Sequence, residues 1–448
     1  FHIFLLKGNV IETTKGLNLP ISGIPTSVVD ASTAINSIAI LGSDYVGLKP
    51  TMLIEEGDTV LAGQKLFENK KNPGTFITTP SSGIIKSINR GEKRRFLSLI
   101  IDTDEALDVT KFNLNDYSNS IEFLVDTGAL SYFRSRPYNR IPEPNILPSA
   151  IFVNACDTNP LSVNPHVLIK ENQHLFNQGL DFMKSINSQI KVFCSHQNND
   201  FDTSIDGIRY TQFNGPHPSG LVGTHIHFLH PVGQNRTVWA ISWQEVISLG
   251  YLLAHQKLRS EKLVSIGGPS VHDPKVLNIK YGSNLSEVTA GKISENSRII
   301  SGSVLNGHTA ENVMNYLGAF DNQISILPDE SNDILFNWAM PGAKLHSKLS
   351  TFISSWIKPK EFNFNVSMNG GNRAIVPISS YQEIMPLNIL TTQLLKSLVT
   401  FDIELGEKLG ALELAPEDLG LASYVCPSKY DYQSILDLNL EKMYEEFR

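Results

Sequence analysis

The stretch that decides the fold of the first part of the chain is KPTMLIEEGDTVLAGQKLFENKKNPGTFITTPSSGIIKSINRGEKRRFLSLII, residues 49–101. Gly57-Asp58 and Gly63-Gln64 are turn pairs six residues apart, and Pro80-Ser81-Ser82-Gly83 is a further turn. Short apolar runs between regular glycine turns are typical of a small all-β sandwich or barrel. We therefore predict a β domain over residues 15–110.

The spacing of this stretch, G-D-x-V-x-x-G-x-x-L followed by x-x-P-x-x-G-x-I, resembles that of biotinyl/lipoyl carrier domains. Those domains carry a modified lysine at a hairpin tip, and here the corresponding tip is ENKKNP, residues 68–73. Neither D-K-A nor M-K-M surrounds Lys70 or Lys71. The domain could carry a modified lysine, or it could have the carrier fold without any modified lysine. The missing sequence context favours the second alternative.

Residues 111–260 alternate between strand-like and helix-like patterns. Short apolar runs predict buried strands, and apolar residues three and four apart predict helices. Strand, helix and strand in this order predict an α/β domain with some parallel sheet. The predicted strands are 150–154, 191–194 and 236–241, and the predicted helices are 170–186 and 243–258.

The last third of the chain returns to strands and then becomes helical. In residues 261–330, Y-G-S-x-L-x-E-V after two strands resembles the soluble-ligand-binding β-grasp module, a ubiquitin-like fold. Residues 331–379 are mixed, and helix dominates in residues 380–448. A terminal helix is predicted because four apolar residues share one of its faces; they are Leu436, Leu440, Met443 and Phe447.

Charge and cysteine content exclude several classes of protein. The chain has 448 residues, with 37 Lys and Arg against 45 Asp and Glu, so its net charge of −8 argues against a nucleic-acid partner. Its cysteines, Cys156, Cys194 and Cys426, form no C-x-x-C motif, which excludes a disulfide framework and a cysteine-built zinc or iron–sulfur site. The pattern suits a reducing compartment. No apolar run is long enough to span a bilayer, and FHIFLL at residues 1–6 is not expected to be a signal peptide.

A second distinctive stretch, GPHPSGLVGTHIHFLH, contains His217, His225, His227 and His230. On a strand, His225 and His227 would point to the same face and could bind zinc. Local hydrogen bonding is the alternative, and it is favoured because no Asp or Glu lies nearby in the sequence. The glycines of this stretch form neither G-x-G-x-x-G nor G-x-x-x-x-G-K-[ST], so no dinucleotide or triphosphate loop is recognisable.

A third stretch, GALSYFRSRPYNR at residues 128–140, alternates aromatic rings with arginines. Such a segment could hold a planar ligand or the acidic surface of a partner. It could equally be a linker that anchors two domains. No nucleophile motif such as G-x-S-x-G occurs, so no self-contained active site is predicted.

Long motifs spread over nearly the whole chain resemble the NqrA family, whose members are subunits of the sodium-translocating NADH:quinone oxidoreductases of bacteria. They are KGLNLPISG (15–23), LGSDYVGLKPTMLIEEGD (41–58), LFENKKNPG (66–74), ACDTNPL (155–161), FNGPHPSGLVGTHIHFLHPV (213–232), RIISGSVLNG (298–307), FNWAMPG (336–342) and YVCPSKYDY (424–432). This family is related to the RnfC subunits of the Rnf complexes and to the NADH-binding flavoprotein subunit of respiratory complex I.

The resemblance implies a multidomain α/β fold. Its expected parts are a biotinyl/lipoyl-carrier-like β domain, a Rossmann-like α/β domain, a β-grasp module, a mixed connecting region and a helical domain. In the order of the chain, their expected limits are 15–110, 111–260, 261–330, 331–379 and 380–448.

The relatives also imply which cofactors to expect. They bind FMN and NADH phosphates on a glycine-rich loop, whereas the matching GALSYFRSRP carries Leu130, Tyr132 and Phe133, which would block backbone approach. They hold an iron–sulfur cluster with several cysteines, whereas Cys426 stands alone. We therefore expect no redox cofactor and no metal on this chain, with the flavins and iron centres carried by other subunits.

The resemblance further implies a peripheral subunit on the cytoplasmic face of the bacterial inner membrane, with no catalytic residue of its own. The expected partners are the other subunits of the complex, NqrB to NqrF, chiefly the membrane protein NqrB, and quinone. The complex acts as NADH:ubiquinone reductase (Na+-transporting), coupling NADH oxidation and ubiquinone reduction to Na+ export. The predicted quinone-binding residues are Tyr132, Phe133, Arg134, Arg136, His217 and His225. The alternatives are a purely structural assembly subunit and, less favoured, an independent flavoenzyme.

Overall fold

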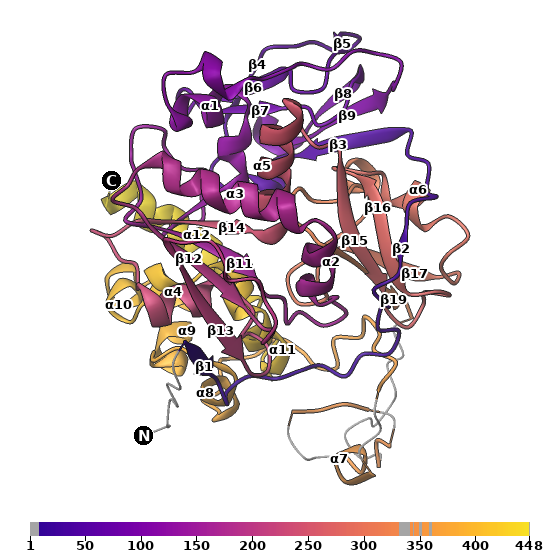
Figure 1. Cartoon of the computed structure of the whole chain (residues 1–448). Helices are drawn as coiled ribbons and strands as arrows, with labels where there is room; N and C mark the ends of the chain where they lie inside the picture. The colour runs from indigo at the N-terminus through magenta and orange to yellow at the C-terminus, as the bar shows by residue number, and fades with distance from the viewer. Residues whose placement is uncertain (1–8, 331–340, 344, 349–351, 358–360, 448) are drawn as a thin grey trace.

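A computed structural model of the chain describes residues 9–330, 341–343, 345–348, 352–357 and 361–447. Within these residues the strands form two six-stranded sheets, one four-stranded sheet and one three-stranded sheet. Figure 1 shows the two smaller sheets at the top, the α/β sheet below them and the other large sheet beside it. The predicted motif FNWAMPG and the connecting region 331–379 lie partly outside the described residues, and the segment 1–6 lies wholly outside them.

The α/β sheet has the strand order β1-β13-β12-β11-β14-β10, and its strands are parallel except for β10 at the edge. Each strand predicted in this region is present, and so is the helix predicted over 243–258, whereas the helix predicted over 170–186 is divided between two helices at Asn172. The strands are β1 (Val10–Glu12), β10 (Arg134–Arg136), β11 (Ala150–Ala155), β12 (Lys191–His196), β13 (Ile208–Asn214) and β14 (Val238–Ser242). The helices are α1 (Ser120–Asp126), α2 (Pro165–Glu171), α3 (Gln173–Ile186), α4 (Val222–Leu229) and α5 (Trp243–His255).

Helices cover both faces of this sheet, because its strands are apolar on both sides. Ile151 and Val153 of β11 join the core with α3 and α5, whereas Phe152 packs with Val222 and Ile226 of α4. The two helices on one face approach closely at glycines. A Cβ on Gly250 of α5 would lie 1.9 Å from the backbone oxygen of Leu175 in α3.

The stretch 49–101 folds as two small antiparallel sheets, as its turn pattern predicts. One has the order β3-β9-β8-β5 and the other β4-β6-β7. The strands are β3 (Ser37–Leu41), β4 (Pro50–Met52), β5 (Thr59–Val60), β6 (Lys65–Asn69), β7 (Phe76–Thr78), β8 (Gly83–Arg90) and β9 (Phe96–Thr103). The exposed Lys70 and Lys71 lie at the turn between β6 and β7.

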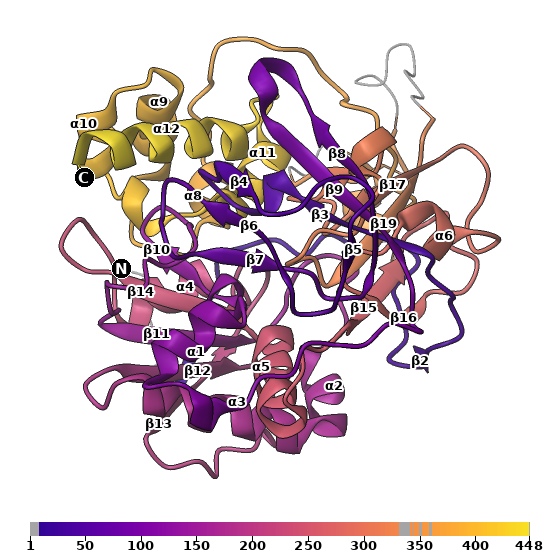
Figure 2. The ribbon, with the colours of Figure 1, turned by 90° about the horizontal axis from the view of Figure 1, so that it is seen from above.

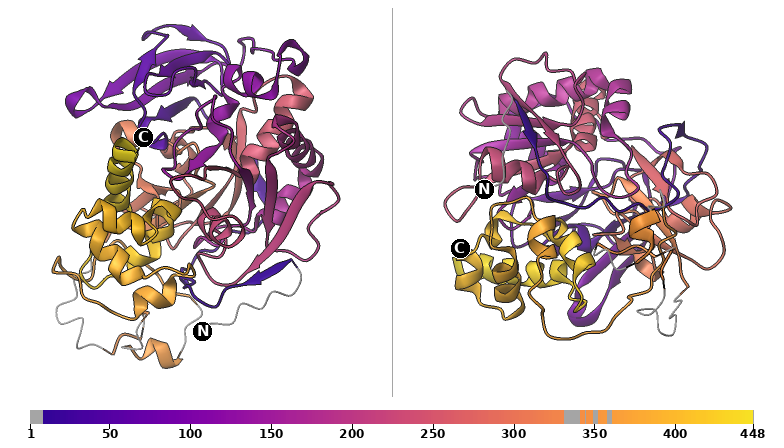
Figure 3. Two further views of the ribbon diagram at one scale, coloured as in Figure 1. Left: turned by 90° about the vertical axis from the view of Figure 1, so that its left-hand side faces the viewer. Right: turned by 90° about the horizontal axis from the view of Figure 1, so that it is seen from below.

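The second large sheet has the order β18-β17-β19-β15-β16-β2 and carries the short helix α6 (Leu285–Thr289). Its strands are β2 (Val29–Asp30), β15 (Glu261–Gly267), β16 (Lys275–Lys280), β17 (Ser297–Ser301), β18 (His308–Thr309) and β19 (Gln323–Pro328). The N-terminal segment therefore contributes β1 to one large sheet and β2 to the other. Figure 3 shows this indigo segment running between them.

The C-terminal part is helical, and its helices pack beside the α/β sheet (Figures 2 and 3). Its helices are α8 (Ser380–Ile384), α9 (Thr391–Val399), α10 (Ile403–Lys408), α11 (Gly420–Val425) and α12 (Tyr432–Phe447), while α7 (Ser354–Ile357) precedes them. The predicted apolar face of the terminal helix is confirmed, since Leu436, Leu440 and Met443 are buried and Phe447 packs against the same cluster.

Candidate functional site

A cleft of about 380 Å³ lies at the carboxyl ends of β11 and β14. The chain leaves β11 through α2 and α3 toward β12 on one side, whereas β14 lies on the other side. In open parallel sheets such a reversal of strand order leaves a crevice in which ligands bind. Asn154, Cys156, Ser242 and Trp243 line the cleft from these strand ends.

Two further parts of the chain complete the cleft. Gly302, Ser303 and Asp321 come from the second large sheet and its loops, and Glu417 and Gln433 come from the C-terminal helical part. The site therefore exists only when all three parts are packed together.

The structure brings three of the six predicted quinone-binding residues to this cleft. Tyr132 ends a 3-10 helix, Ala129–Tyr132, and Arg134 and Arg136 follow on β10. β10 pairs with β14, with Arg134 opposite Ala240 and Arg136 opposite Val238, and this pairing carries the segment to the cleft wall.

Arg134 and Arg136 are both engaged by the chain itself. Arg134 donates to the backbone oxygens of Ser131, Phe133 and Asp44, and its guanidinium lies 3.6 Å from the centre of the Phe320 ring. Burial lowers the pKa of Arg134 to about 10, so it stays charged at neutral pH.

Arg136 is 2% exposed and pairs with two acids of the C-terminal part. Its Nη2 lies 2.9 Å from Glu417 Oε1 and its Nη1 lies 3.7 Å from Asp418 Oδ2. The sequence left open whether this segment holds a ligand, meets an acidic partner surface or anchors two domains. Arg136 anchors two parts of the chain through the chain's own acidic residues.

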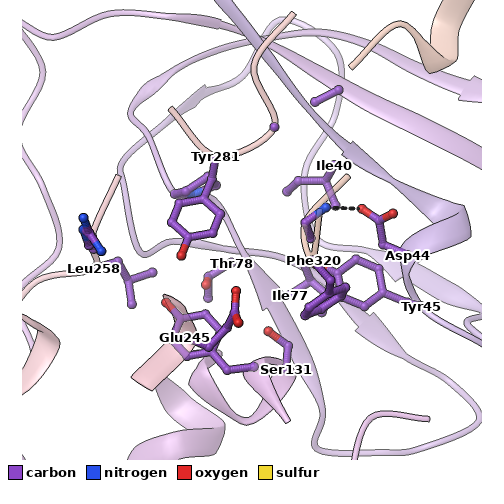
Figure 4. Close-up of a pocket in the computed structure, with 16 residues that line it drawn as sticks. Ile40, Asp44, Tyr45, Ile77, Thr78, Ser131, Glu245, Leu258, Tyr281 and Phe320 are labelled. Atoms are coloured by element: carbon purple, nitrogen blue, oxygen red, sulfur yellow. Dashed lines mark hydrogen bonds between the residues drawn. The ribbon is translucent and has the colours of Figure 1, made fainter. Parts of the chain in front are cut away.

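An inner chamber of about 70 Å³ adjoins the cleft, and Tyr132, Asp44, Glu245 and Phe320 line both (Figure 4). Figure 4 shows the side chains of Glu245 and Tyr281 pointing into the same space. Glu245 is 2% exposed and accepts from Ser242 Oγ at the start of α5. Its Oε1 lies 3.9 Å from Lys262 Nζ and has no hydrogen-bond partner in the described structure.

The other three predicted residues lie in the protein core and line neither hollow. Phe133 is fully buried against Trp239, with ring centres 5.4 Å apart. His217 is 1% exposed and shares a 3.2 Å hydrogen bond between its Nδ1 and Thr158 Oγ1. His225 is fully buried, with its Nε2 2.9 Å from the backbone oxygen of Ser219.

The structure decides between the two interpretations of the histidine stretch. Residues 222–229 form a helix, so His225 and His227 do not share a face as they would on a strand, and His225 bonds locally to Ser219. An acidic partner also exists, because Glu413 Oε2 lies 2.7 Å from His227 Nδ1. The backbone N–H of Asn388 donates to the other ring nitrogen of His227. These partners are distant in sequence, so the local pattern gave no sign of them.

Burial of His225 predicts a specific pH dependence. Burial lowers its pKa from 6.5 to about 3, outweighing the hydrogen bond to Ser219. The folded state therefore binds fewer protons than the unfolded state, and the stabilisation is full above pH 6.5 and is lost as the pH falls toward 3. We expect the wild type to lose about 2 kcal/mol more unfolding free energy than His225→Gln between pH 7 and pH 5. Urea denaturation at both pH values measures this, and parallel losses would show that His225 does not contribute.

Acidic side chains dominate the cleft. Its lining contains the acids Asp44, Asp157, Glu245, Asp321, Glu417 and Asp437. The only basic side chains of that lining are Arg134 and Arg136. Burial raises the pKa of Asp44 and of Asp157 to about 6. Only Glu245 had a local sequence signal, because Ser242 and Glu245 form the S-x-x-E pattern of a helix start.

The segment that matches the relatives' glycine-rich loop does not fit a phosphate. Leu130 and Phe133 are buried in the core, and Gly128 approaches Thr78 so closely that a Cβ would lie 2.5 Å from its Oγ1. The Sγ of Cys426 lies 3.1 Å from the Tyr381 hydroxyl in a buried cluster. Among the described residues no three His, Cys, Asp or Glu side chains are grouped to hold a metal ion. Nor do those residues include a helix with the length and apolar character needed to cross a membrane.

Three family models match the chain, in the order of its parts. They describe an NqrA N-terminal barrel-sandwich hybrid domain at residues 11–104, an NqrA second alpha/beta domain at 117–258 and an NQRA C-terminal domain at 263–312. The barrel-sandwich and α/β descriptions agree with the small sheets and the parallel sheet seen here.

Curated relatives match over almost the whole length, among them the A subunits of Na(+)-translocating NADH-quinone reductases from three bacteria. That of Haemophilus influenzae is 42% identical over 447 residues, covering 98% of this chain and 100% of the relative. That of Actinobacillus pleuropneumoniae is 41% identical over 449 residues, with the same coverage. That of Yersinia pseudotuberculosis is 42% identical over 437 residues, covering 95% and 98%. Among solved structures, NAD+-reducing NiFe hydrogenase in the H2-reduced state covers 40% of each chain at 12% identity and a TM-score of 0.31, too low to support an argument.

Proposed function

Because the chain belongs to the NqrA family of Na(+)-translocating NADH-quinone reductase subunits, we propose that it contributes to quinone binding in that complex. Its membership makes it part of an oxidoreductase that transports sodium. We further propose that it lies on the cytoplasmic face of the inner membrane and docks on the membrane protein NqrB.

One observation carries the quinone proposal: the cleft at the strand ends opens toward an inner chamber with aromatic walls and a few buried polar groups. Sites for uncharged planar ligands are typically apolar and aromatic, with a small number of polar groups that fix orientation. The chamber offers the rings of Tyr45, Tyr132, Tyr281 and Phe320. Arg259 lines it too, and its Nη1 is buried without a hydrogen-bond partner in the described structure.

In this proposal the quinone ring lies among the aromatic side chains of the chamber, and its tail lies in the wider cleft. The quinone oxygens accept hydrogen bonds, for which Tyr132 and Arg259 are the proposed donors. The electrons come from other subunits, which carry the flavins and iron centres, and this chain carries no redox cofactor. A colourless purified chain agrees with this assignment, and a flavin absorption spectrum would favour an independent flavoenzyme.

Tyr132 provides the direct test, because it lines both the cleft and the chamber. We expect Tyr132→Leu to raise the quinone KM of the assembled complex about tenfold, which corresponds to roughly 1.4 kcal/mol of binding. Tyr132→Phe, which removes only the hydroxyl, should have a smaller effect. Quinone titrations of NADH oxidation by the purified complex measure both.

Tyr210→Phe is the matched control. Tyr210 is a buried tyrosine that lies on β13 and lines neither hollow. It should leave the quinone KM unchanged. If Tyr132→Leu assembles normally and also leaves the quinone KM unchanged, the alternative of a purely structural assembly subunit becomes the better description.

The finer domain assignments are also proposals. The parallel sheet with helices on both faces supports a Rossmann-like domain over 111–260. The sheet that contains β15, β16, β17 and β19, with α6 beside it, supports a β-grasp module over 261–330. The small antiparallel sheets support a carrier-like domain over 15–110 that serves docking, and helices α8 to α12 support the helical domain over 380–448.

A further inference from the structure

Two helix N-termini open onto the cleft, and the chain places a buried carboxylate at each. Val222, the first residue of α4, and Trp243, the first residue of α5, both line the cleft. Glu245 belongs to the first turn of α5 and accepts from Ser242 there. Asp418, which is distant in the sequence, lies at the first turn of α4. Carboxylates are stabilised at such positions by the helix dipole.

The position of Asp418 is defined by close contacts. A Cβ built on Gly223, the second residue of α4, would lie 2.4 Å from each carboxylate oxygen of Asp418. A side chain at position 223 would therefore displace the carboxylate from the helix. The Oδ2 atom accepts from the backbone N–H of Ala415 at 2.8 Å, and the residue is 4% exposed.

The surroundings of Asp418 combine two features that phosphate sites use. A helix N-terminus beside a buried guanidinium is a common arrangement for binding phosphate. Arg136 supplies the guanidinium, with its Nη1 3.7 Å from Asp418 Oδ2. Arg136 Nε and Nη1 and Asp418 Oδ1 are buried and make no hydrogen bond in the described structure. The charge of Arg136 is thus balanced by the ion pair, but two of its guanidinium nitrogens still have no hydrogen-bond acceptor among the described residues.

We propose that Asp418 is a built-in anion that occupies the phosphate position at the start of α4. It thereby restricts the cleft to ligands without a phosphate group, and its removal uncovers a site for a small oxyanion. The acids Glu417, Asp157 and Asp437 on the cleft wall add to the exclusion, because they repel the remainder of a phosphorylated ligand. This proposal goes beyond quinone binding and stands independently of it.

The test uses inorganic phosphate as the probe and the full-length chain as the protein. Asp418→Ala frees the space and leaves Arg136 and the α4 N-terminus in place. We expect this variant to bind phosphate at least about tenfold more tightly than the wild type, as removal of one directly competing charge predicts. Phosphate at ten times its Kd should raise the melting temperature of the variant by about 1.5 °C relative to chloride at equal ionic strength.

Asp437→Ala is the matched control, since Asp437 is an acid of the cleft lining that belongs to α12. It should gain no phosphate binding, which separates a specific site from a general loss of negative charge. If Asp418→Ala shows no gain, or if the wild type or Asp437→Ala binds phosphate as tightly as Asp418→Ala does, the proposal is wrong.

Asp418→Ser is a second variant, for the case that Asp418→Ala does not fold. The serine side chain is smaller than that of aspartate, and its hydroxyl can still accept from the Ala415 N–H. If neither variant folds in chloride, refolding in phosphate decides the question. Recovery of folded protein supports the proposal, and failure to recover overturns it. None of these measurements uses quinone or enzyme activity, so the outcome does not depend on the quinone assignment.

Discussion

Arg136→Met is expected to lower the free energy of unfolding by about 3–5 kcal/mol, the usual cost of removing one partner from a buried ion pair. The methionine keeps the apolar stem of the side chain but leaves Asp418 and Glu417 without their cation. Asp418 then stays 4% exposed with no positive charge next to it, and the contact between β10 and the C-terminal part is lost. Urea denaturation monitored by fluorescence measures the loss.

Two further variants sharpen this prediction. Lys86→Met removes an ion pair with Asp102 whose side chains are 57% and 51% exposed, so it should cost less than about 1 kcal/mol. In Arg136→Met with Asp418→Asn, the buried negative charge is removed as well, and much of the lost stability should return. A small effect of Arg136→Met alone would show that the ion pair does not hold the two parts together.

Phe133→Ala should destabilise the protein by about 3–5 kcal/mol, because it opens a large cavity in the core. The Phe133 ring is fully buried against Trp239 of β14, so the cavity forms in the core of the α/β domain and not in the cleft. Phe133→Leu retains most of the volume and should cost less than about 1.5 kcal/mol.

Thermal denaturation and the quinone KM of the assembled complex, measured on the same variants, give the test for Phe133. We expect the melting temperature to fall and the KM of Phe133→Leu to stay at the wild-type value. The opposite result, an unchanged melting temperature with a raised KM, would show that Phe133 belongs to the quinone site, as the sequence predicts.

The regular elements were predictable because their side-chain patterns are local. The apolar run 150–154 and the helical spacing of Leu175, Phe176, Leu180 and Met183 each correspond to one element of the structure. The helix over 222–229 was not predicted, because Val222, Thr224 and Ile226 also alternate with other residues as in a strand. Its true conformation depends on packing against β11, which the local pattern does not reveal.

The candidate site was predictable only in part, for the same reason. Tyr132, Arg134 and Arg136 stand in one conspicuous stretch and line the cleft together. Their neighbours in the structure come from distant segments. Arg134 bonds to Asp44, which lies 90 residues earlier in the sequence, and Arg136 bonds to Glu417, which lies 281 residues later. A lone acid in a polar stretch has no local pattern that marks it as part of a cleft.

The N-terminal strand β1 has a consequence for synthesis on the ribosome. The side chain of Thr13, directly after β1, bonds to Asn214, which is 201 residues further along the chain. At about 5–20 residues per second, this partner emerges roughly 10–40 s later. During that interval the unpaired N–H and C=O groups of β1 are open to other strands. The segment that contains β1 therefore waits for a strand about 200 residues further along the chain, and during that interval it is a target for chaperones.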